Sequence, residues 1–276
     1  MNKISVLISV YKSETPECLD LSLKSVLEDQ TLLPYEIVLI EDGPLGDDLL
    51  TVIAKWQKLF QGWFVIVRNE ENIGLTKSLN KGISYATGDL IARMDSDDIS
   101  HPERFAKQVK YLQEHLDIMV VGGSLQEFRA PMELMDIRKY PLTHEEIVNK
   151  IHRACPLAHP SVMMRSEVFS AGIRYDERYR TSQDIALWFT LLKRGYRLAN
   201  IEDVVLYFRH NDNIYQRRGR NKAVNEFKIY MSGIRALYGI FSWRYVFPIC
   251  RFVSRILPPS LIEYIYKSPI RKWVIK

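Results

Sequence analysis

Short apolar runs alternate with longer amphipathic segments along the first 120 residues of the chain. The first run, residues 3–11, is rich in Ile and Val and has the length of a buried strand. Behind it, Thr15-Pro16-Glu17 provides a helix start, because Thr caps a helix N-terminus and Pro suits the first helical turn. Leucines and valines then follow at helical spacing. This pattern predicts a strand followed by a helix.

The same alternation continues along the chain. It predicts strands at 36–40, 63–67, 89–94 and 118–121, and helices at 47–60, 74–86 and 102–115. Strands that alternate with helices of this length form a parallel sheet covered on both faces. After residue 124 the pattern is weaker and predicts only a helix near 144–151, a strand near 160–164 and a helix at 185–192. The predicted fold class is therefore α/β, with a mostly parallel sheet flanked by helices.

The composition is that of an ordinary globular protein. Of the 276 residues, 47% are hydrophobic and 26% are charged, which excludes a disordered or fibrous chain. No 18 apolar residues follow one another, so we expect no membrane-spanning helix. The first residues have too short an apolar run for a signal peptide. Three cysteines that lie far apart in the sequence predict a reducing compartment and no structural zinc.

The charge is distributed unevenly. Residues 216–276 contain 13 lysines and arginines against two acids, whereas residues 1–215 have more acids than bases. We expect a catalytic domain at 1–215 and a basic helical region at 216–276. A helix over 244–256 would carry its arginines on one side and apolar residues elsewhere, with a break at Pro248. Such a helix suits an anionic membrane surface. The alternative is a helix that packs on the catalytic domain.

Carboxylates gather where two predicted strands end. Asp95-Ser96-Asp97-Asp98 directly follows one strand, and Asp42 directly follows another. The carboxyl ends of parallel strands meet at one edge of a sheet, where folds of this kind bind their ligands. Three carboxylates in four residues favour Mg²⁺ or Mn²⁺ holding a substrate phosphate. The alternative is a solvated acidic turn.

Other polar residues are weaker candidates when taken alone. Asp42 could bind a nucleoside or could stabilise a turn. Gly74 could allow a close backbone approach to a ligand or could serve as a turn residue. Asp184 lies at the start of a predicted helix. It could be a general base, or simply an acid that the helix dipole favours in the first turn. Arg209-His210 could contact a diphosphate or form a charge pair at a strand end. The chain has neither GxGxxG nor GxxxxGK[ST], which disfavours a dinucleotide fold and a P-loop.

Six segments, taken together and in order, resemble the inverting glycosyltransferases of family 2. They are SVLISVYKSE, EIVLIEDG, NIGLTKSLNKGISYATGDLIARMDSDD, HPSVMMRSEVF, QDIALWFTLLKRG and YFRHNDN. The resemblance implies a GT-A fold, with a nucleotide-sugar half over about 1–100 and an acceptor half over about 101–215. It also implies an enzyme that moves a sugar from a nucleotide diphosphate donor, usually UDP-linked, to an acceptor hydroxyl with inversion.

The resemblance assigns roles to individual residues. Asp42 would contact the uracil, and Asp95 would approach the ribose or the donor sugar. Asp97 would bind the metal with Asp98 close by, and Asp184 would be the catalytic base. The nucleotide-sugar site implied in this way consists of Ser9, Tyr11, Glu14, Asp42, Asn72, Gly74, Lys77, Arg93, Asp95 and Ser96. The implied acceptor or diphosphate site consists of His159, Arg209 and His210.

The predicted function is a metal-dependent transfer from a UDP-sugar during synthesis of an O antigen or exopolysaccharide. In an in-line displacement, a carboxylate removes the acceptor proton while Mn²⁺ or Mg²⁺ neutralises the leaving diphosphate. The basic C-terminal region indicates contact with a membrane surface. We therefore expect a polyprenyl-diphosphate-linked saccharide as the acceptor, and a cytoplasmic protein that is peripheral on the inner face of the cytoplasmic membrane. No nucleic-acid partner is expected, because no recognition motif accompanies the charge.

Two other classes of protein share part of this pattern. A sugar-1-phosphate nucleotidyltransferase has a similar sheet and metal site, but it usually begins with a glycine-rich loop, which is missing after Val10. A non-catalytic basic membrane adaptor would need the C-terminal region without needing Asp95, Asp97 and Asp184. Binding of UDP with Mn²⁺ separates the adaptor from the transferase.

Overall fold

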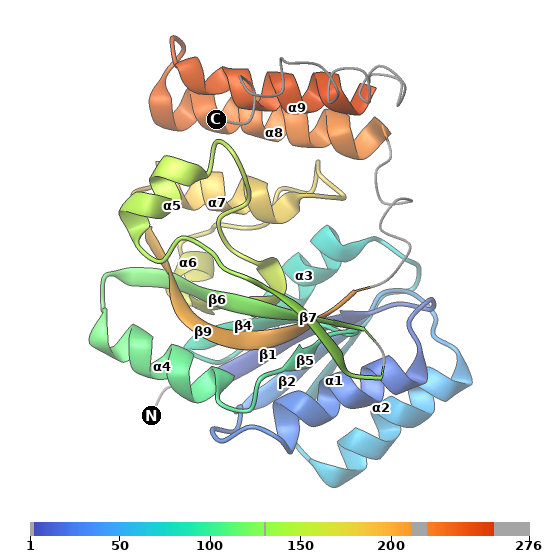
Figure 1. Ribbon diagram of the computed structural model, residues 1–276. Helices are drawn as coiled ribbons and strands as arrows, with labels where there is room; N and C mark the ends of the chain where they lie inside the picture. Colours follow the sequence, from blue (N-terminus) through green and yellow to red (C-terminus); the bar gives the residue numbers. More distant parts are fainter. Residues whose placement is uncertain (1–2, 130, 211–219, 257–276) are drawn as a thin grey trace.

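The central element is a single curved sheet, formed by nine strands within the computed structural model, which describes residues 3–129, 131–210 and 220–256 (Figure 1). The strands are β1 Ile4–Val10, β2 Glu36–Glu41, β3 Phe64–Arg68, β4 Leu90–Asp95, β5 Ile99–Ser100, β6 Ile118–Arg129, β7 Glu133–Arg138, β8 Met163–Arg165 and β9 Arg197–Arg209. Their order is β3-β2-β1-β4-β8-β6-β9-β5, and β7 pairs with β6. β1 to β4 pair in parallel, as do β6 and β9, whereas β5, β7 and β8 pair antiparallel. The predicted α/β fold with a mostly parallel sheet is confirmed.

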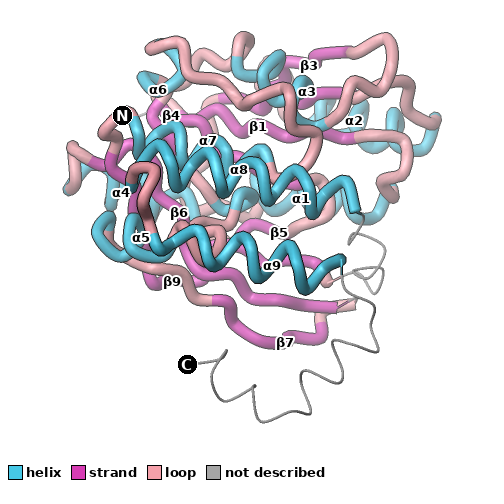
Figure 2. The backbone as a smooth tube through the Cα atoms, turned by 90° about the horizontal axis from the view of Figure 1, so that it is seen from above, coloured by secondary structure: helices cyan, strands magenta, loops and turns pink. Residues whose placement is uncertain are grey.

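Helices cover both faces of the sheet (Figures 1 and 2). They are α1 Pro16–Leu27, α2 Asp47–Leu59, α3 Leu75–Ile83, α4 Arg104–Glu114, α5 His144–Lys150, α6 Glu167–Ser170, α7 Gln183–Lys193, α8 Arg220–Tyr238 and α9 Val246–Ile256. Alternate residues of β1 belong to two separate cores. Val6 and Ile8 pack with α1, α2 and α4, while Leu7 packs with α3, α5 and α7. Burial on both faces explains why the first strand is an uninterrupted apolar run.

The N-terminal elements follow the predicted pattern closely. Thr15 caps α1, with its hydroxyl accepting a hydrogen bond from the Cys18 backbone N–H at 3.3 Å, and Pro16 is the first helical residue. Later elements depart from the prediction. β6 extends to Arg129, and the sequence pattern does not predict β5, β7 or most of β9. β6 and β9 pair with each other in parallel with several register shifts, so tertiary pairing overrides their irregular apolar pattern.

Pro248 does not divide the C-terminal helix, contrary to the sequence-based expectation. α9 begins at Val246, so Pro248 lies in the first turn, where a backbone N–H has no partner within the helix. A short 3₁₀ turn, Trp243–Tyr245, precedes α9 instead. The missing N–H of proline is therefore tolerated at this position.

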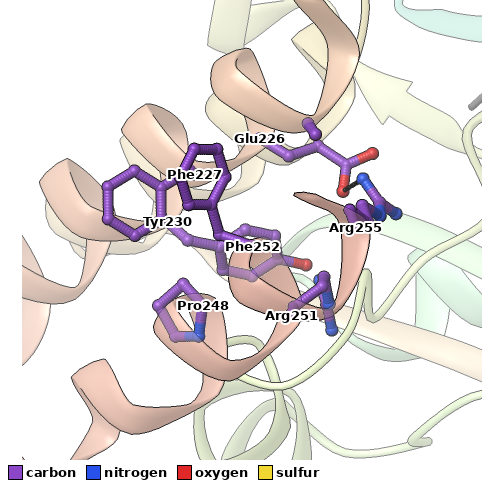
Figure 3. A pocket seen from close by; sticks show the side chains of 8 residues that line it. Glu226, Phe227, Tyr230, Pro248, Arg251, Phe252 and Arg255 are labelled. Carbon is purple, nitrogen blue, oxygen red and sulfur yellow. Dashed lines mark hydrogen bonds and ion pairs between the residues drawn. The ribbon is translucent and has the colours of Figure 1, made fainter. Parts of the chain in front are cut away.

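α8 and α9 form an antiparallel pair that lies over α7 and α5 (Figures 1 and 2). α8 packs against α7, where the Tyr230 and Phe189 ring centroids lie 5.8 Å apart. Figure 3 shows the contact between α8 and α9: the rings of Phe227 and Phe252 stack at 4.6 Å, and Arg255 forms a 2.8 Å ion pair with Glu226. The helical part of the basic region thus docks on the rest of the protein, through α8 on α7 and through Phe247 of α9, whose ring centroid lies 5.0 Å from that of His152. Among the helices that the structure describes, none is long and apolar enough to cross a bilayer.

Candidate functional site

A cleft lies at the carboxyl edge of β1, β2 and β4. The strand register brings the ends together, because Ser9 pairs with both Ile40 and Asp95. The cleft has a volume of about 460 Å³. It is lined by Ser9, Tyr11, Ser13, Glu14, Asp42, Asn72, Gly74, Leu75, Arg93, Asp95, Ser96, Asp97 and Phe208. This set contains Asp97 and every residue predicted for the nucleotide-sugar site except Lys77, which lies exposed on α3.

The acidic turn after β4 brings three carboxylates together. Asp95, Asp97 and Asp98 each have a carboxylate oxygen within 4.8 Å of the others. The end of β9 holds this turn in place: the Arg209 backbone N–H donates to Asp98 Oδ1 at 2.9 Å, and Arg209 Nε donates to the Asp97 carbonyl at 2.7 Å. Arg209 does not line the cleft. The contacts of Arg209 in the structure hold the acidic turn, and its contact with a diphosphate stays a prediction.

The electrostatics of this turn favour a bound cation. Burial, together with the charges of Asp95 and Glu14, raises the pKa of Asp97 to about 6. Burial and the charges of Asp97 and Asp95 raise the pKa of Asp98 well above its usual value. The Oδ2 atom of Asp98 is buried and has no hydrogen-bond partner among the described residues. An unpartnered buried oxygen within a carboxylate cluster fits a divalent cation with oxygen ligands, such as Mn²⁺ or Mg²⁺.

Arg93 places a buried positive charge beside the acids. Its Nη2 atom donates to Asp95 Oδ1, while Nε and Nη1 are buried without a partner in the described part of the chain. Arg104 lies nearby and donates from Nη2 to the Arg93 carbonyl at 2.7 Å. Burial and the charge of Arg93 lower the pKa of Arg104 to about 9. Since unpaired buried donors are costly, the free N–H groups of Arg93 in the cleft wall favour an anionic ligand.

Asp42 organises the loop on the opposite side of the cleft. Its Oδ1 accepts from Asn69 Nδ2 at 3.2 Å and from the Ile73 N–H at 2.9 Å. Its Oδ2 accepts from Asn72 Nδ2 and the Gly74 N–H, both at 3.1 Å. Gly74 has a φ of +86°, which a side chain would make unfavourable. A nucleobase that bonds to Asp42 therefore has to replace one of these donors, and the exposed Asn72 side chain is the one free to leave.

Asp184 lies in the first turn of α7, outside the residues that line the cleft. Its Oδ2 accepts from the Cys155 thiol at 3.7 Å. Burial raises its pKa, while the Ile185 N–H and the charge of Arg93 act in the opposite direction. Ser182, two residues earlier, has a φ of +61° and is the one non-glycine residue with positive φ that the described ranges contain. Asp184 thus follows a sharp turn. It also lies close enough to Arg93, which lines the cleft, for the charge of Arg93 to affect its pKa.

The two predicted histidines also lie outside the cleft lining. The buried His159 places Nε2 2.7 Å from the Tyr175 hydroxyl and packs edge-on against Trp188. Burial and the charge of Arg93 lower the pKa of His159 well below its usual value, so the ring is neutral. His210 continues β9, and its N–H donates to the Phe128 carbonyl at 2.8 Å.

Three lining residues are missing from the sequence-based prediction, namely Ser13, Leu75 and Phe208. Each falls within one of the six segments that carry the family resemblance, so the segments themselves contain the signal. The sequence indicates Cys155 only as a reduced cysteine. Its contact with Asp184 brings together residues from two distant parts of the chain and has no local pattern in the sequence.

Known proteins resemble this chain along most of its length. The family model described as Glycosyl transferase family 2 matches residues 5–172. Amylovoran biosynthesis glycosyltransferase AmsE of Erwinia amylovora is 34% identical over 266 residues, which cover 96% of this chain and 98% of that protein. An Escherichia coli protein named UDP-Gal:alpha-D-GlcNAc-diphosphoundecaprenol beta-1,3-galactosyltransferase is 30% identical, over 99% of this chain and 98% of its own length.

Solved structures share the fold. The mannosyltransferase PcManGT of Pyrobaculum calidifontis, in complex with GDP-Man and Mn²⁺, has a TM-score of 0.65 and 15% identity over 99% of this chain and 83% of its own. S. aureus TarS 1-349, in complex with UDP-GlcNAc, has a TM-score of 0.62 and 16% identity over 98% of this chain and 85% of its own. The likeness confirms the predicted GT-A-like fold.

The raised pKa of Asp97 leads to a testable dependence of stability on pH in metal-free protein. The pKa of Asp97 is near 3.8 in the unfolded chain and about 6 in the folded protein, so between these pH values the folded state binds more protons. The ionised Asp97 therefore destabilises the fold fully above pH 6. This destabilisation becomes smaller as the pH falls toward 4. In EDTA, Asp97→Asn should therefore melt a few degrees above the wild type at pH 7 and close to it at pH 4. The exposed Asp136→Asn should follow the wild type at both values, and an equal gap at pH 4 and pH 7 for Asp97→Asn would contradict the assignment.

Proposed function

Because this chain belongs to glycosyl transferase family 2, we propose that it transfers a sugar from a UDP-sugar to a hydroxyl of a lipid-linked saccharide. The observation that carries the proposal is the cleft at the ends of β1, β2 and β4. It combines a carboxylate cluster that fits a divalent cation with a buried arginine that has unpaired donors within the described structure. Both features suit the diphosphate of a nucleotide-sugar.

In the proposed donor complex, Asp97 binds Mn²⁺ or Mg²⁺ with Asp95 and Asp98 beside it. The cation would neutralise the charge that builds on the departing UDP. Arg93 provides a positive charge in the cleft wall for the anionic donor, and the Asp42 loop borders the nucleoside. Similar structures solved with GDP-Man and Mn²⁺ or with UDP-GlcNAc support this class of donor.

Asp184 is the proposed general base. It accepts the proton of the acceptor hydroxyl as the oxygen bonds to the anomeric carbon, while the bond from that carbon to the UDP oxygen breaks. Attack from the side opposite UDP inverts the configuration and needs no covalent intermediate. Burial raises the pKa of Asp184, which brings a carboxylate closer to the neutral range in which a base is effective. The Cys155 thiol contacts Oδ2.

The names of the relatives support a lipid-linked acceptor. The Escherichia coli relative is named for an acceptor on diphosphoundecaprenol. Other relatives are named for amylovoran biosynthesis and, in the case of WbnJ of Escherichia coli, for O-antigen biosynthesis. We extend these to the present chain as assembly of a surface polysaccharide on a polyprenyl diphosphate, at the inner face of the cytoplasmic membrane.

The exposed side of the α8–α9 pair supports a peripheral membrane contact. Large apolar side chains are exposed along the turn after α8 and along α9. This α9 apolar face consists of Ile240, Phe241, Trp243, Val246, Ile249 and Val253. The exposed Arg235 belongs to the same helical pair. Apolar and aromatic residues next to basic ones favour the headgroup region of an anionic bilayer.

The Asp184→Asn variant tests the proposed chemistry. Turnover with a panel of UDP-sugars, Mn²⁺ and synthetic lipid-diphosphate sugars, followed by mass spectrometry, should fall by about 10²- to 10⁴-fold because the base is lost. The dissociation constant for UDP, from calorimetry, should stay within a few-fold of the wild-type value. The matched control Asp29→Asn, at an exposed ion pair with Lys24, should keep full activity. A loss of UDP affinity as large as the loss of rate would refute the role of Asp184.

Membrane contact is tested by co-sedimentation with phosphatidylglycerol vesicles. The double variant Phe241→Ser/Trp243→Ser should lower the bound fraction by at least about tenfold, because each large side chain contributes roughly 1.5–3 kcal/mol when it leaves water. Leu116→Ser, which changes an exposed apolar residue on a different part of the surface, is the control and should bind as the wild type does. Equal binding of the double variant and the control would rule out this face.

A further inference from the structure

A second cavity, of about 500 Å³, lies between the loop that precedes α7 and the N-terminal half of α8. We call it the basic groove. Its lining consists of Arg178, Arg180, Thr181, Lys222, Val224, Asn225 and Lys228. Four of these side chains are cationic, and none of the described lining residues is acidic. The groove therefore concentrates positive charge in an open, ligand-sized space.

Most of this positive charge is not neutralised by the protein. Arg178 is paired with Asp176, to which its Nε donates at 2.9 Å. Arg180, Lys222 and Lys228 make no side-chain hydrogen bond or ion pair with any residue that the structure describes. The acid on the same stretch of α8, Glu226, is directed to Arg255 of α9 (Figure 3). Three unpaired cations around one cavity favour an anionic ligand with several acceptor oxygens.

The basic groove adjoins the donor cleft. Arg180 lies against Gly74, where a β-carbon would come within 3.3 Å of the guanidinium, and Gly74 lines the cleft. The loop of Arg180 is fastened to α3, because Thr76 Oγ1 donates to the Tyr179 carbonyl at 2.6 Å. Arg180 therefore stands between the two cavities.

The groove is also close to the proposed base. Thr181 and Asp184 are three positions apart in the sequence, so their Cα atoms lie within about 11 Å of each other. α8 carries the other wall of the groove and runs beside α9 (Figure 2), which carries part of the α9 apolar face. A single molecule with an anionic centre can thus lie between the base on one side and the lipid-facing helices on the other.

We propose that the basic groove binds the diphosphate of the lipid-linked acceptor and so directs the acceptor sugar to Asp184. This inference rests on the proposed function. Lysine and arginine provide charge-assisted hydrogen bonds to phosphate oxygens, and Thr181 and Asn225 add neutral polar groups. The groove contributes binding energy remote from the reacting carbon, which positions the hydroxyl for attack.

Calorimetry with farnesyl diphosphate tests the assignment on the full chain. EDTA is present throughout, so that no divalent cation can hold the diphosphate in the donor cleft. The double variant Lys222→Ala/Lys228→Ala should weaken binding at least tenfold. Alanine preserves helix propensity at both sites, and circular dichroism verifies the fold. The control Lys58→Ala/Lys110→Ala removes the same charge from exposed positions on α2 and α4 and should bind within twofold of the wild type.

Two further measurements separate the outcomes. Binding of phosphatidylglycerol vesicles should be unchanged in Lys222→Ala/Lys228→Ala. If this variant lost vesicle binding but kept farnesyl diphosphate binding, the groove would be a phospholipid headgroup site, and the proposal would be overturned. Equal farnesyl diphosphate binding by this variant and the wild type would also overturn it. UDP binding with Mn²⁺ should be normal in the variant, and its absence in the wild type would instead refute the proposed donor site.

Discussion

Mutual repulsion among Asp95, Asp97 and Asp98 is the constraint on which the candidate site depends. A free chain would separate these carboxylates, but the end of β4 is fixed by a sheet that is buried on both faces. Arg209 holds the turn from the end of β9, and Arg93 compensates part of the charge. Negative charge remains, and one oxygen of Asp98 accepts no hydrogen bond from any described residue. These two features make the cleft suited to a cation and its phosphate ligand.

The rest of the proposed activity is arranged around this point by elements from distant parts of the chain. Asp42 holds the loop that borders the nucleoside, and α7 brings Asp184 within reach of the charge of Arg93. α8 packs on α7 and carries one wall of the basic groove, while α9 exposes its apolar face. The proposed sites would then lie in sequence across the α7–α9 side of the molecule: the donor cleft, the base, the groove for the acceptor diphosphate and the membrane-facing surface.

The sequence predicts those features that depend on local physics. β1, α1 with its Thr15 cap, and the acidic turn after β4 all follow from apolar period, capping and strand ends. Features that depend on distant pairing escape it. β9 obtains its partners from β6 and β5, and the basic groove joins residues near 180 to residues near 225. The prediction for Pro248 is wrong because α9 begins at Val246, so that the proline lies in the first turn, where its missing N–H is tolerated.

The central claim is that the carboxylates after β4 bind the cation that holds the UDP-sugar. Calorimetric titration of UDP, in Mn²⁺ and in EDTA, tests it most directly in the wild type, in Asp97→Ala and in the exposed control Asp136→Ala. Mn²⁺ should strengthen UDP binding strongly in the wild type and the control, and Asp97→Ala should lose this dependence. An Asp97→Ala variant that binds UDP with the same Mn²⁺ dependence as the wild type would contradict the central claim.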